Sequence, residues 1–215
     1  MNETASGKLT ASWARVGGIA GILSVLAFIG GSVIGGILEA PSTIGDLLGF
    51  SFGPLLITAF VGLFYLIRAH QDSISLQLGT IFGVIAGAVV TNMIVVQSAL
   101  FRSIEIGLRD TIGPAWNGLN AIQLGLDVSW DIFISLATIL VGIAMFSHPK
   151  FGKIFGGITT LIGLLLLVFN LLTFPTPPGS AGLIDLGPVM GIWYLVISVQ
   201  MLRSVGWTKE EETSS

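Results

Sequence analysis

The chain has 215 residues, of which 53% are hydrophobic and only 10% are charged, and its formal net charge is −3. Soluble domains carry about 25% charged residues, so this composition excludes an ordinary soluble globular domain. The sequence contains no cysteine, which excludes disulfides, thiolate metal sites and cysteine nucleophiles. No run of basic residues indicates nucleic acid as a partner.

Six apolar runs approach or exceed the roughly 20 residues that cross a bilayer as a helix. They cover residues 16–38, 50–67, 78–101, 128–146, 155–174 and 184–202. The first run is longer than the roughly 7–15 apolar residues of a signal peptide, so we expect it to be retained as a span. The sequence thus predicts an all-α, polytopic protein of the cell membrane. Its single six-helix transmembrane domain covers residues 13–206, with disordered tails at 1–12 and 207–215.

The basic residues alternate between the predicted loops. With the N-terminus inside, most of them fall on the cytoplasmic side, and only Arg102 and Arg109 fall outside. The cytoplasmic set is Lys8, Arg15, Arg68, Lys150, Lys153, Arg203 and Lys209. Cytoplasmic loops of membrane proteins carry an excess of Lys and Arg, so both termini are predicted to be cytoplasmic. Short loops then pair the six helices as three hairpins.

The third and fourth helices are predicted over residues 78–110 and 115–146, meeting at Gly113-Pro114. At 1.5 Å per residue each would be roughly 48 Å long, against a hydrocarbon core of about 30 Å. The surplus predicts a long external helical hairpin, in which Pro114 starts the second helix. The alternative is an interfacial helix over 115–126 that lies flat, separated from the span by a bend at Gly125.

Polar residues form a stripe on each helix of this hairpin, because their spacings of three, four and seven place them on one helical face. The stripe of the fourth helix comprises Asn117, Asn120, Gln123, Asp127, Asp131, Ser135 and Thr138. The stripe of the third helix comprises Thr91, Ser98, Arg102, Glu105 and Arg109. In so apolar a protein, we expect the two stripes to face each other or a shared cavity.

Asp127 and Asp131 are the strongest candidates for a site, since their i, i+4 spacing puts both carboxylates on one face. The functional interpretation is a cation, proton or amine site on the outer side, with Gln97, Ser98, Asn120 and Gln123 as further binding candidates. The structural alternative is an ion-pair clasp, and it is favoured because charges inside membranes usually pair with one another. Counting outward from residue 113 places Arg102 within reach of Asp127. Glu105 and Arg109 share the face of Arg102, so Glu105 can pair along its own helix, and the favoured alternative for both is a solvated helix end.

No enzyme signature is present: the sequence has no Gly-x-Ser-x-Gly elbow, no His-Glu-x-x-His and no phosphate-binding Gly-x4-Gly-Lys. We therefore predict no catalytic residue, no cofactor and no metal site. The absence of these signatures favours a protein that is not an enzyme. His70 and His148 fall in cytoplasmic loops, too far from the carboxylates to share a metal. Tryptophans such as Trp116 and Trp130 suit the aromatic belt at a membrane interface.

Two short stretches carry a resemblance: His148-Pro149-Lys150-Phe151-Gly152, which opens a glycine-rich helix, and Gly191-Ile192-Trp193-Tyr194 in the last run. With these, mostly over its C-terminal third, the chain resembles the six-span membrane proteins of prokaryotes grouped as domains of unknown function. The resemblance implies a six-span membrane fold and no catalytic residue.

Two hypotheses on function follow. The first is a transporter or channel-like protein for a small solute or cation, which uses the Asp127/Asp131 pocket. The second is a non-catalytic structural, assembly or lipid-binding subunit, in which the polar stripes only fix the register of the helices. The partners expected are membrane lipids and a small solute or cation. A second copy could also bind, through glycine-rich helix faces such as Gly79, Gly83 and Gly87.

Overall fold

The computed structural model describes residues 3–37, 43–105, 107, 110–111, 113–172, 183–184 and 186–206. Over these ranges the protein is all-α, as predicted, and has six helices. They are α1 (Glu3–Ile37), α2 (Thr43–Arg68), α3 (Ile74–Glu105), α5 (Pro114–Met145), α6 (Gly152–Leu171) and α7 (Gly187–Ser204). Helix α1 begins at Glu3, so residues 3–12 are helical where the sequence predicts a disordered tail. The predicted tail at 207–215 lies outside the described residues.

Five helices are long and apolar enough to cross a membrane: α1, α2, α3, α5 and α6. By helix length and hydropathy, the chain is a multi-pass integral membrane protein. The sixth helix, α7, has 18 residues and is not among these five. It is the shortest of the six helices.

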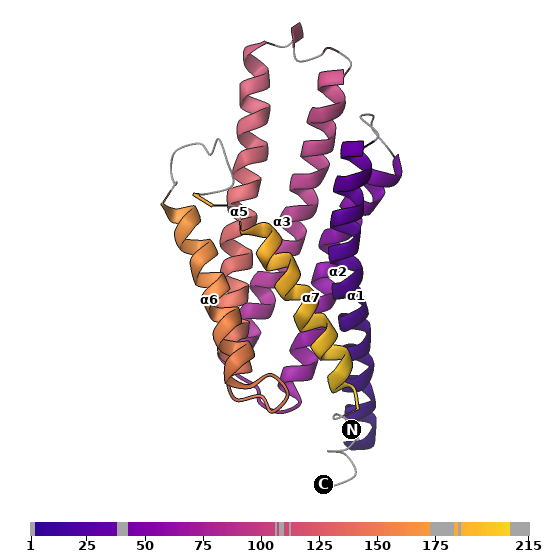
Figure 1. Cartoon of the computed structure of the whole chain (residues 1–215), viewed down its shortest axis with the longest axis vertical. Coiled ribbons are helices and arrows are strands. Elements are labelled where there is room, and N and C mark those ends of the chain that lie inside the picture. The colour runs from indigo at the N-terminus through magenta and orange to yellow at the C-terminus, as the bar shows by residue number, and fades with distance from the viewer. Residues whose placement is uncertain are drawn as a thin grey trace.

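Each helix from α1 to α6 packs on the next one along the chain (Figure 1). The helices α1 and α2, and the helices α3 and α5, form the first two predicted hairpins. The third pair differs from the prediction, because α6 packs along α5 whereas α7 crosses the bundle obliquely and packs on α1. Small residues allow this crossing: a Cβ added to Gly21 of α1 would lie 3.0 Å from the Cβ of Ser198 on α7.

Glycines mark the points where helices cross most closely. A Cβ on Gly62 of α2 would lie 2.5 Å from the Cα of Gly17 on α1. The predicted glycine face of α3 is used in the same way, since a Cβ on Gly83 would overlap the Phe60 ring of α2 at 2.5 Å. A Cβ on Gly79 would lie 2.9 Å from the Val141 side chain of α5. These glycines therefore serve contacts within the bundle, as expected for helices that pack closely in lipid.

The hairpin of α3 and α5 projects beyond the other helices at one end of the molecule (Figure 1). Both helices have 32 residues. Pro114 lies in the first turn of α5, as predicted, where its missing N–H costs little. The helix then runs without a break to Met145, so the alternative of a separate flat helix with a bend at Gly125 is wrong. Helix α3 ends at Glu105, five residues earlier than predicted.

The opposite end of the bundle holds the turns between α2 and α3 and between α5 and α6, which contact each other. The Ser147 hydroxyl donates to the Gln71 side-chain oxygen at 2.5 Å. The rings of His70 and His148 lie edge to face with their centroids 5.6 Å apart. The start of α1 and the end of α7 lie at this same end (Figure 1).

Candidate functional site

A cavity of about 290 Å³ lies within the bundle, between the turn end and the projecting hairpin. Its described lining comes from α1, α2, α3, α5 and α7, and each helix contributes one face. On α5 the lining residues are Asp127, Trp130, Asp131 and Ile134, at the helical spacings i, i+3, i+4 and i+7. The regular 3.6-residue period of a single long helix thus places the two carboxylates and an indole ring in one cavity.

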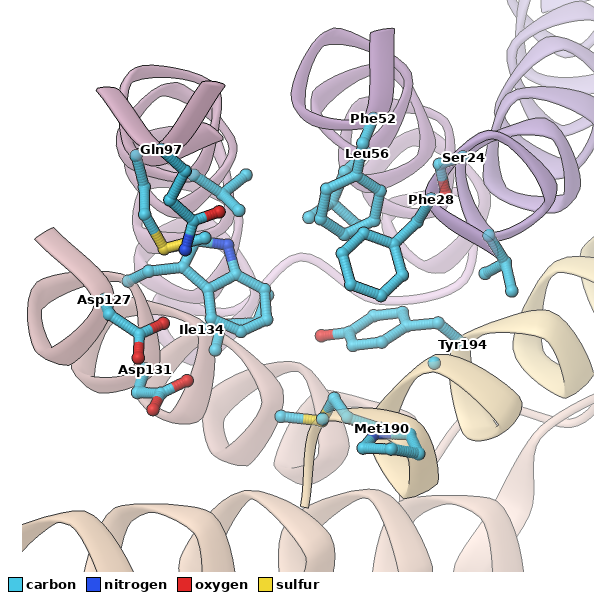
Figure 2. Close-up of a pocket in the computed structure, with 17 residues that line it drawn as sticks. Ser24, Phe28, Phe52, Leu56, Gln97, Asp127, Asp131, Ile134, Met190 and Tyr194 are labelled. Atoms are coloured by element: carbon cyan, nitrogen blue, oxygen red, sulfur yellow. The ribbon is translucent and has the colours of Figure 1, made fainter. Parts of the chain in front are cut away.

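The carboxylates form one wall of this cavity (Figure 2). Asp131 is buried with 6% of its surface exposed, whereas Asp127, one turn away, is partly exposed. Gln97 of α3 lines the same cavity, so three of the predicted binding candidates come together there. Both aspartates also interact with other groups of the protein.

The opposite wall is apolar and aromatic. Figure 2 shows Phe28 of α1 with Phe52 and Leu56 of α2 across the cavity from the two aspartates. The ring centroids of Phe28 and Phe52 are 5.1 Å apart, and those of Phe52 and Trp130 are 6.5 Å apart. Contacts at these distances are typical of packed aromatic pairs. The aromatic side chains therefore continue from the apolar wall to the helix that carries the carboxylates.

Helix α7 begins part-way along the bundle and supplies a further face of the cavity (Figure 1). The lining residues Gly187, Met190, Gly191 and Tyr194 again follow helical spacing. Two hydrogen bonds fix this helix. The Tyr194 hydroxyl lies 2.7 Å from Thr138 Oγ1 on α5, and the Trp193 indole donates to Thr159 Oγ1 on α6 at 2.8 Å.

The direction of the first of these hydrogen bonds follows from counting protons. Thr138 has one hydroxyl proton and donates it to the Ile134 carbonyl at 2.6 Å. Tyr194 must then be the donor to Thr138, so its own proton is used inside the protein. The Ser24 hydroxyl, which also lines the cavity, donates to the Gly21 carbonyl at 2.8 Å. Of the polar groups in the lining, the carboxylates, the Gln97 amide and the Trp130 indole N–H, which has no hydrogen-bond partner in the described structure, therefore remain as the main determinants of what could bind.

The remaining predicted candidates lie elsewhere. Asn120 is exposed, and Ser98 and Gln123 are partly buried, but none of the three lines the cavity. The polar stripe of α5 runs from exposed residues near Pro114 to the fully buried Thr138, because α5 enters the bundle progressively along its length. Only the middle of the stripe, at Asp127 and Asp131, meets the cavity.

The predicted clasp between Arg102 and Asp127 is wrong, because Arg102 forms an ion pair with Asp46 of α2. Asp46 lies in the first turn of α2 and Arg102 in the last turn of α3, where each charge also suits the helix dipole. The stripe of α3 turns toward α2 rather than α5: a Cβ on Gly53 of α2 would collide with Thr91. The Glu105 side chain and Arg109 lie outside the described residues, so their pairing stays a prediction.

Sequence reasoning missed the aromatic wall. Trp130 was assigned to a membrane interface, but it packs on Phe52 and lines the cavity. The signal was present, since Trp130 lies three residues after Asp127 and so on the same helical face. No comparable signal connects Phe28 of α1 or Phe52 of α2 to the carboxylates, because tertiary packing brings these residues, far apart in the sequence, to the same cavity.

The two histidines lie at the turn end, as predicted, and contact each other rather than the carboxylates. His148 is buried with 1% exposure, and its Nδ1 accepts a hydrogen bond from the Lys150 backbone N–H at 3.2 Å. Burial lowers the pKa of His148 from 6.5 to about 4. The nearby His70 and Lys150 also lower this pKa, while a backbone contact with Leu66 opposes them. Among the described residues, no group of three or more His, Asp or Glu side chains is arranged to hold a metal ion.

Comparisons with known proteins add no assignment: no family model matches the chain, and neither a curated protein nor a solved structure matches it.

Proposed function

We propose that this membrane protein binds a small cationic solute in the cavity beside Asp127 and Asp131, as a transporter or channel-like protein would. The observation that carries the proposal is the position of Asp131. This carboxylate is 6% exposed and lines a cavity of about 290 Å³ whose opposite wall is aromatic and aliphatic.

The physical reason is the cost of a carboxylate in an apolar interior. An Asp near the centre of a membrane helix costs about 2.5–3.5 kcal/mol on insertion scales, and such residues mark ion or substrate pathways in membrane proteins. Here two aspartates share one face of α5 and line one cavity, and both also interact with other groups of the protein. A cation bound beside them would add a counter-charge that lowers this cost. The shared cavity gives it room to reach both carboxylates.

A second candidate is a structural or lipid-binding subunit. The apolar character of the lining at Phe28, Phe52 and Leu56 favours it, because such a surface accepts an acyl chain. In this case the two aspartates have a structural role, since both already interact with other groups of the protein. The first turn of α7, at Gly187, lines the same cavity. The positive end of a helix dipole stabilises a nearby carboxylate. The two candidates differ in whether an added cation stabilises the fold.

The experiment is a thermal-unfolding series on the purified protein with sodium, potassium, calcium and ethylammonium chlorides at constant ionic strength. A ligand that binds only the folded state raises the melting temperature with its concentration. We expect at least one cation to do so in the wild type, and the effect to vanish in Asp131→Asn, which keeps the shape and removes the charge.

Asp110→Asn is the matched control, because it removes an exposed carboxylate far along the chain from the cavity lining. It should respond to cations as the wild type does. If no cation stabilises the wild type, or if Asp131→Asn responds equally, the proposal is wrong. Stabilisation by added lipid alone would then support the second candidate.

We further propose that all six helices span the membrane with both termini cytoplasmic. The support is the distribution of basic residues along the chain. The start of α1, the end of α2, the start of α6 and the end of α7 lie at one end of the bundle (Figure 1). These segments and the turn before α6 carry Lys8, Arg15, Arg68, Lys150, Lys153 and Arg203. Arg102, on the projecting hairpin, lies toward the other end. This asymmetry matches the positive-inside pattern and supports an orientation in which the cavity wall of Asp127 lies toward the outer side.

Single cysteines test this topology, since the natural chain has none. Exposed positions are available at Ala69, Thr111, Leu183 and Gly206. We expect an impermeant thiol reagent to label Thr111→Cys and Leu183→Cys on intact cells, and Ala69→Cys and Gly206→Cys only after permeabilisation. Labelling of Leu183→Cys and Gly206→Cys from the same side would show that α7 does not cross.

A further inference from the structure

We propose that the solute is an organic ammonium ion with a compact apolar body, rather than a metal ion or a polyol. This inference rests on the proposed function, because it specifies the ligand of the same cavity. Its basis is the division of the lining into two walls: carboxylates on α5, and the rings of Phe28 and Phe52 with Leu56 opposite them (Figure 2).

The donor set does not suit a metal ion. Calcium takes six to eight oxygen ligands, and magnesium keeps near-ideal octahedral geometry with several waters. The described lining offers two carboxylates, the Gln97 amide and the Trp130 indole N–H on one side, and mainly carbon on the other. No group of three or more His, Asp or Glu side chains able to hold a metal occurs in the described part of the chain. The hydration shell of an ion bound at the carboxylates would face the apolar rings of Phe28 and Phe52.

The same lining does not suit a polyol. A sugar needs many hydrogen-bond partners around its whole surface, because each polar group buried without one is costly. Two hydroxyls in the cavity have their protons committed elsewhere: Ser24 donates to Gly21, and Tyr194 donates to Thr138. The polar contacts are thus concentrated on one side of the cavity, at Asp127, Asp131, Gln97 and the Trp130 indole N–H, which suits a ligand with one polar, charged end.

An ammonium ion with an apolar body matches both walls. Its N–H groups are donors, and carboxylates accept charge-assisted hydrogen bonds from them. An aromatic face within about 6 Å also attracts a cation, and Trp130 lies on the same face of α5 as the carboxylates. The body would gain from burial against Phe28, Phe52 and Leu56. A cavity of about 290 Å³ lies at the small end of ligand pockets, which limits the body to about one ring with a short chain.

Gly191 gives a way to block the cavity without touching a charge. It lines the cavity on α7, and a Cβ added there meets nothing within 4 Å. Gly191→Leu should therefore fill ligand space rather than displace a helix. Gly157 of α6 is the matched control, because it is also helical and partly exposed, its added Cβ also meets nothing within 4 Å, and it does not line the cavity. Gly191→Ala, a smaller addition, tests the same point if the leucine variant is not stable.

The test compares 2-phenylethylammonium, the neutral isostere 2-phenylethanol, ethylammonium and calcium, each titrated against the wild type and the variants in thermal unfolding. We expect 2-phenylethylammonium to bind at least tenfold more tightly than the alcohol or ethylammonium, to bind Gly157→Leu as the wild type, and to bind Gly191→Leu at least tenfold more weakly. Asp131→Asn should lose the preference for the ammonium over the alcohol.

The outcomes separate this inference from the function on which it rests. Tighter, Asp131-dependent binding of calcium or ethylammonium would overturn the ligand class and leave the cation-binding function standing. Equal binding of the alcohol would overturn the ligand class in favour of a purely apolar ligand. Undiminished binding to both Gly191 variants would show that the ammonium binds outside the cavity. No Asp131-dependent binding of any cation would overturn the proposed function itself.

Discussion

The two ends of the bundle are built differently. At the turn end, hydrogen bonds link separate elements: Ser147 donates to the Gln71 side chain between two turns, and the Gln200 side chain of α7 donates to the Lys150 backbone carbonyl at 2.6 Å. At the other end, α3 and α5 extend beyond their neighbours (Figure 1). On the projecting part of α5, a Cβ on Gly118 or Gly125 meets nothing within 4 Å.

This difference shows what fixes each helix. Near the turn end, backbone approaches its neighbour so closely that only glycine fits, as at Gly17 and Gly62. Toward the hairpin tip, the ion pair of Arg102 with Asp46 links α3 to α2, and its two side chains are 50% and 19% exposed. Ion pairs this exposed contribute about 0–1 kcal/mol. The cavity lies between these two parts of the bundle.

The largest loss of stability from a single substitution is expected at Gly62. In Gly62→Ala, the new Cβ would lie 2.5 Å from the Gly17 Cα and 2.6 Å from the Trp13 carbonyl oxygen. Both are backbone atoms, so neither can turn aside, and α1 must separate from α2. Overpacking of this kind costs 1–3 kcal/mol and sometimes more, and we expect about 3 kcal/mol or more here. The measurement is the free energy of unfolding in mixed micelles.

Gly118→Ala is the paired variant at the other end. Its added methyl group has open space, and alanine is favoured over glycine in a helix by about 0.5–1 kcal/mol. We expect this variant to be as stable as the wild type or slightly more stable. If Gly118→Ala lowers the free energy of unfolding as much as Gly62→Ala does, the hairpin tip is packed as tightly as the turn end.

The same difference explains how far the sequence could predict the molecule. Helix positions depend on local apolar runs and on helix-breaking or helix-starting residues such as Gly113-Pro114, so α5 starts where predicted. The shared face of Asp127 and Asp131 also depends on the period of one helix, and the structure places both in one cavity. Properties that a single helix determines were predictable.

Which helix a face meets was not predictable in the same way. The pairing of Arg102 with Asp127 assumed that residues equally far from the hairpin tip lie opposite each other. Helix α3 ends at Glu105, so the connection to Pro114 is longer than that assumption allows, and the α3 stripe turns toward α2. The partner at Asp46 lies 56 residues away in the chain. The crossing of α7 onto α1 likewise depends on small residues in helices far apart in the sequence, such as Gly21 and Ser198.

A smaller expected effect is a dependence of stability on pH that arises at the turn end. His148 is buried against His70, and its pKa in the folded protein is about 4, against an ordinary 6.5. Because the unfolded chain binds the proton more readily, this group favours the folded state most above pH 6.5. That advantage is lost as the pH falls toward 4. One pKa unit corresponds to about 1.4 kcal/mol, so the loss should reach about 2 kcal/mol at pH 5.

Two variants isolate this contribution when the free energy of unfolding is measured between pH 8 and pH 4.5. His148→Gln cannot be protonated, so its stability should change less over this range than that of the wild type, by about the amount assigned to His148. His70→Gln removes the neighbouring charge that lowers the pKa of His148, so it should retain a smaller acid-side loss. Asp46→Asn at the hairpin end serves as a control and should leave the difference between the wild type and His148→Gln unchanged. If His148→Gln loses as much stability on acidification as the wild type does, the pH dependence arises elsewhere, and the buried histidine does not couple the two turns to pH.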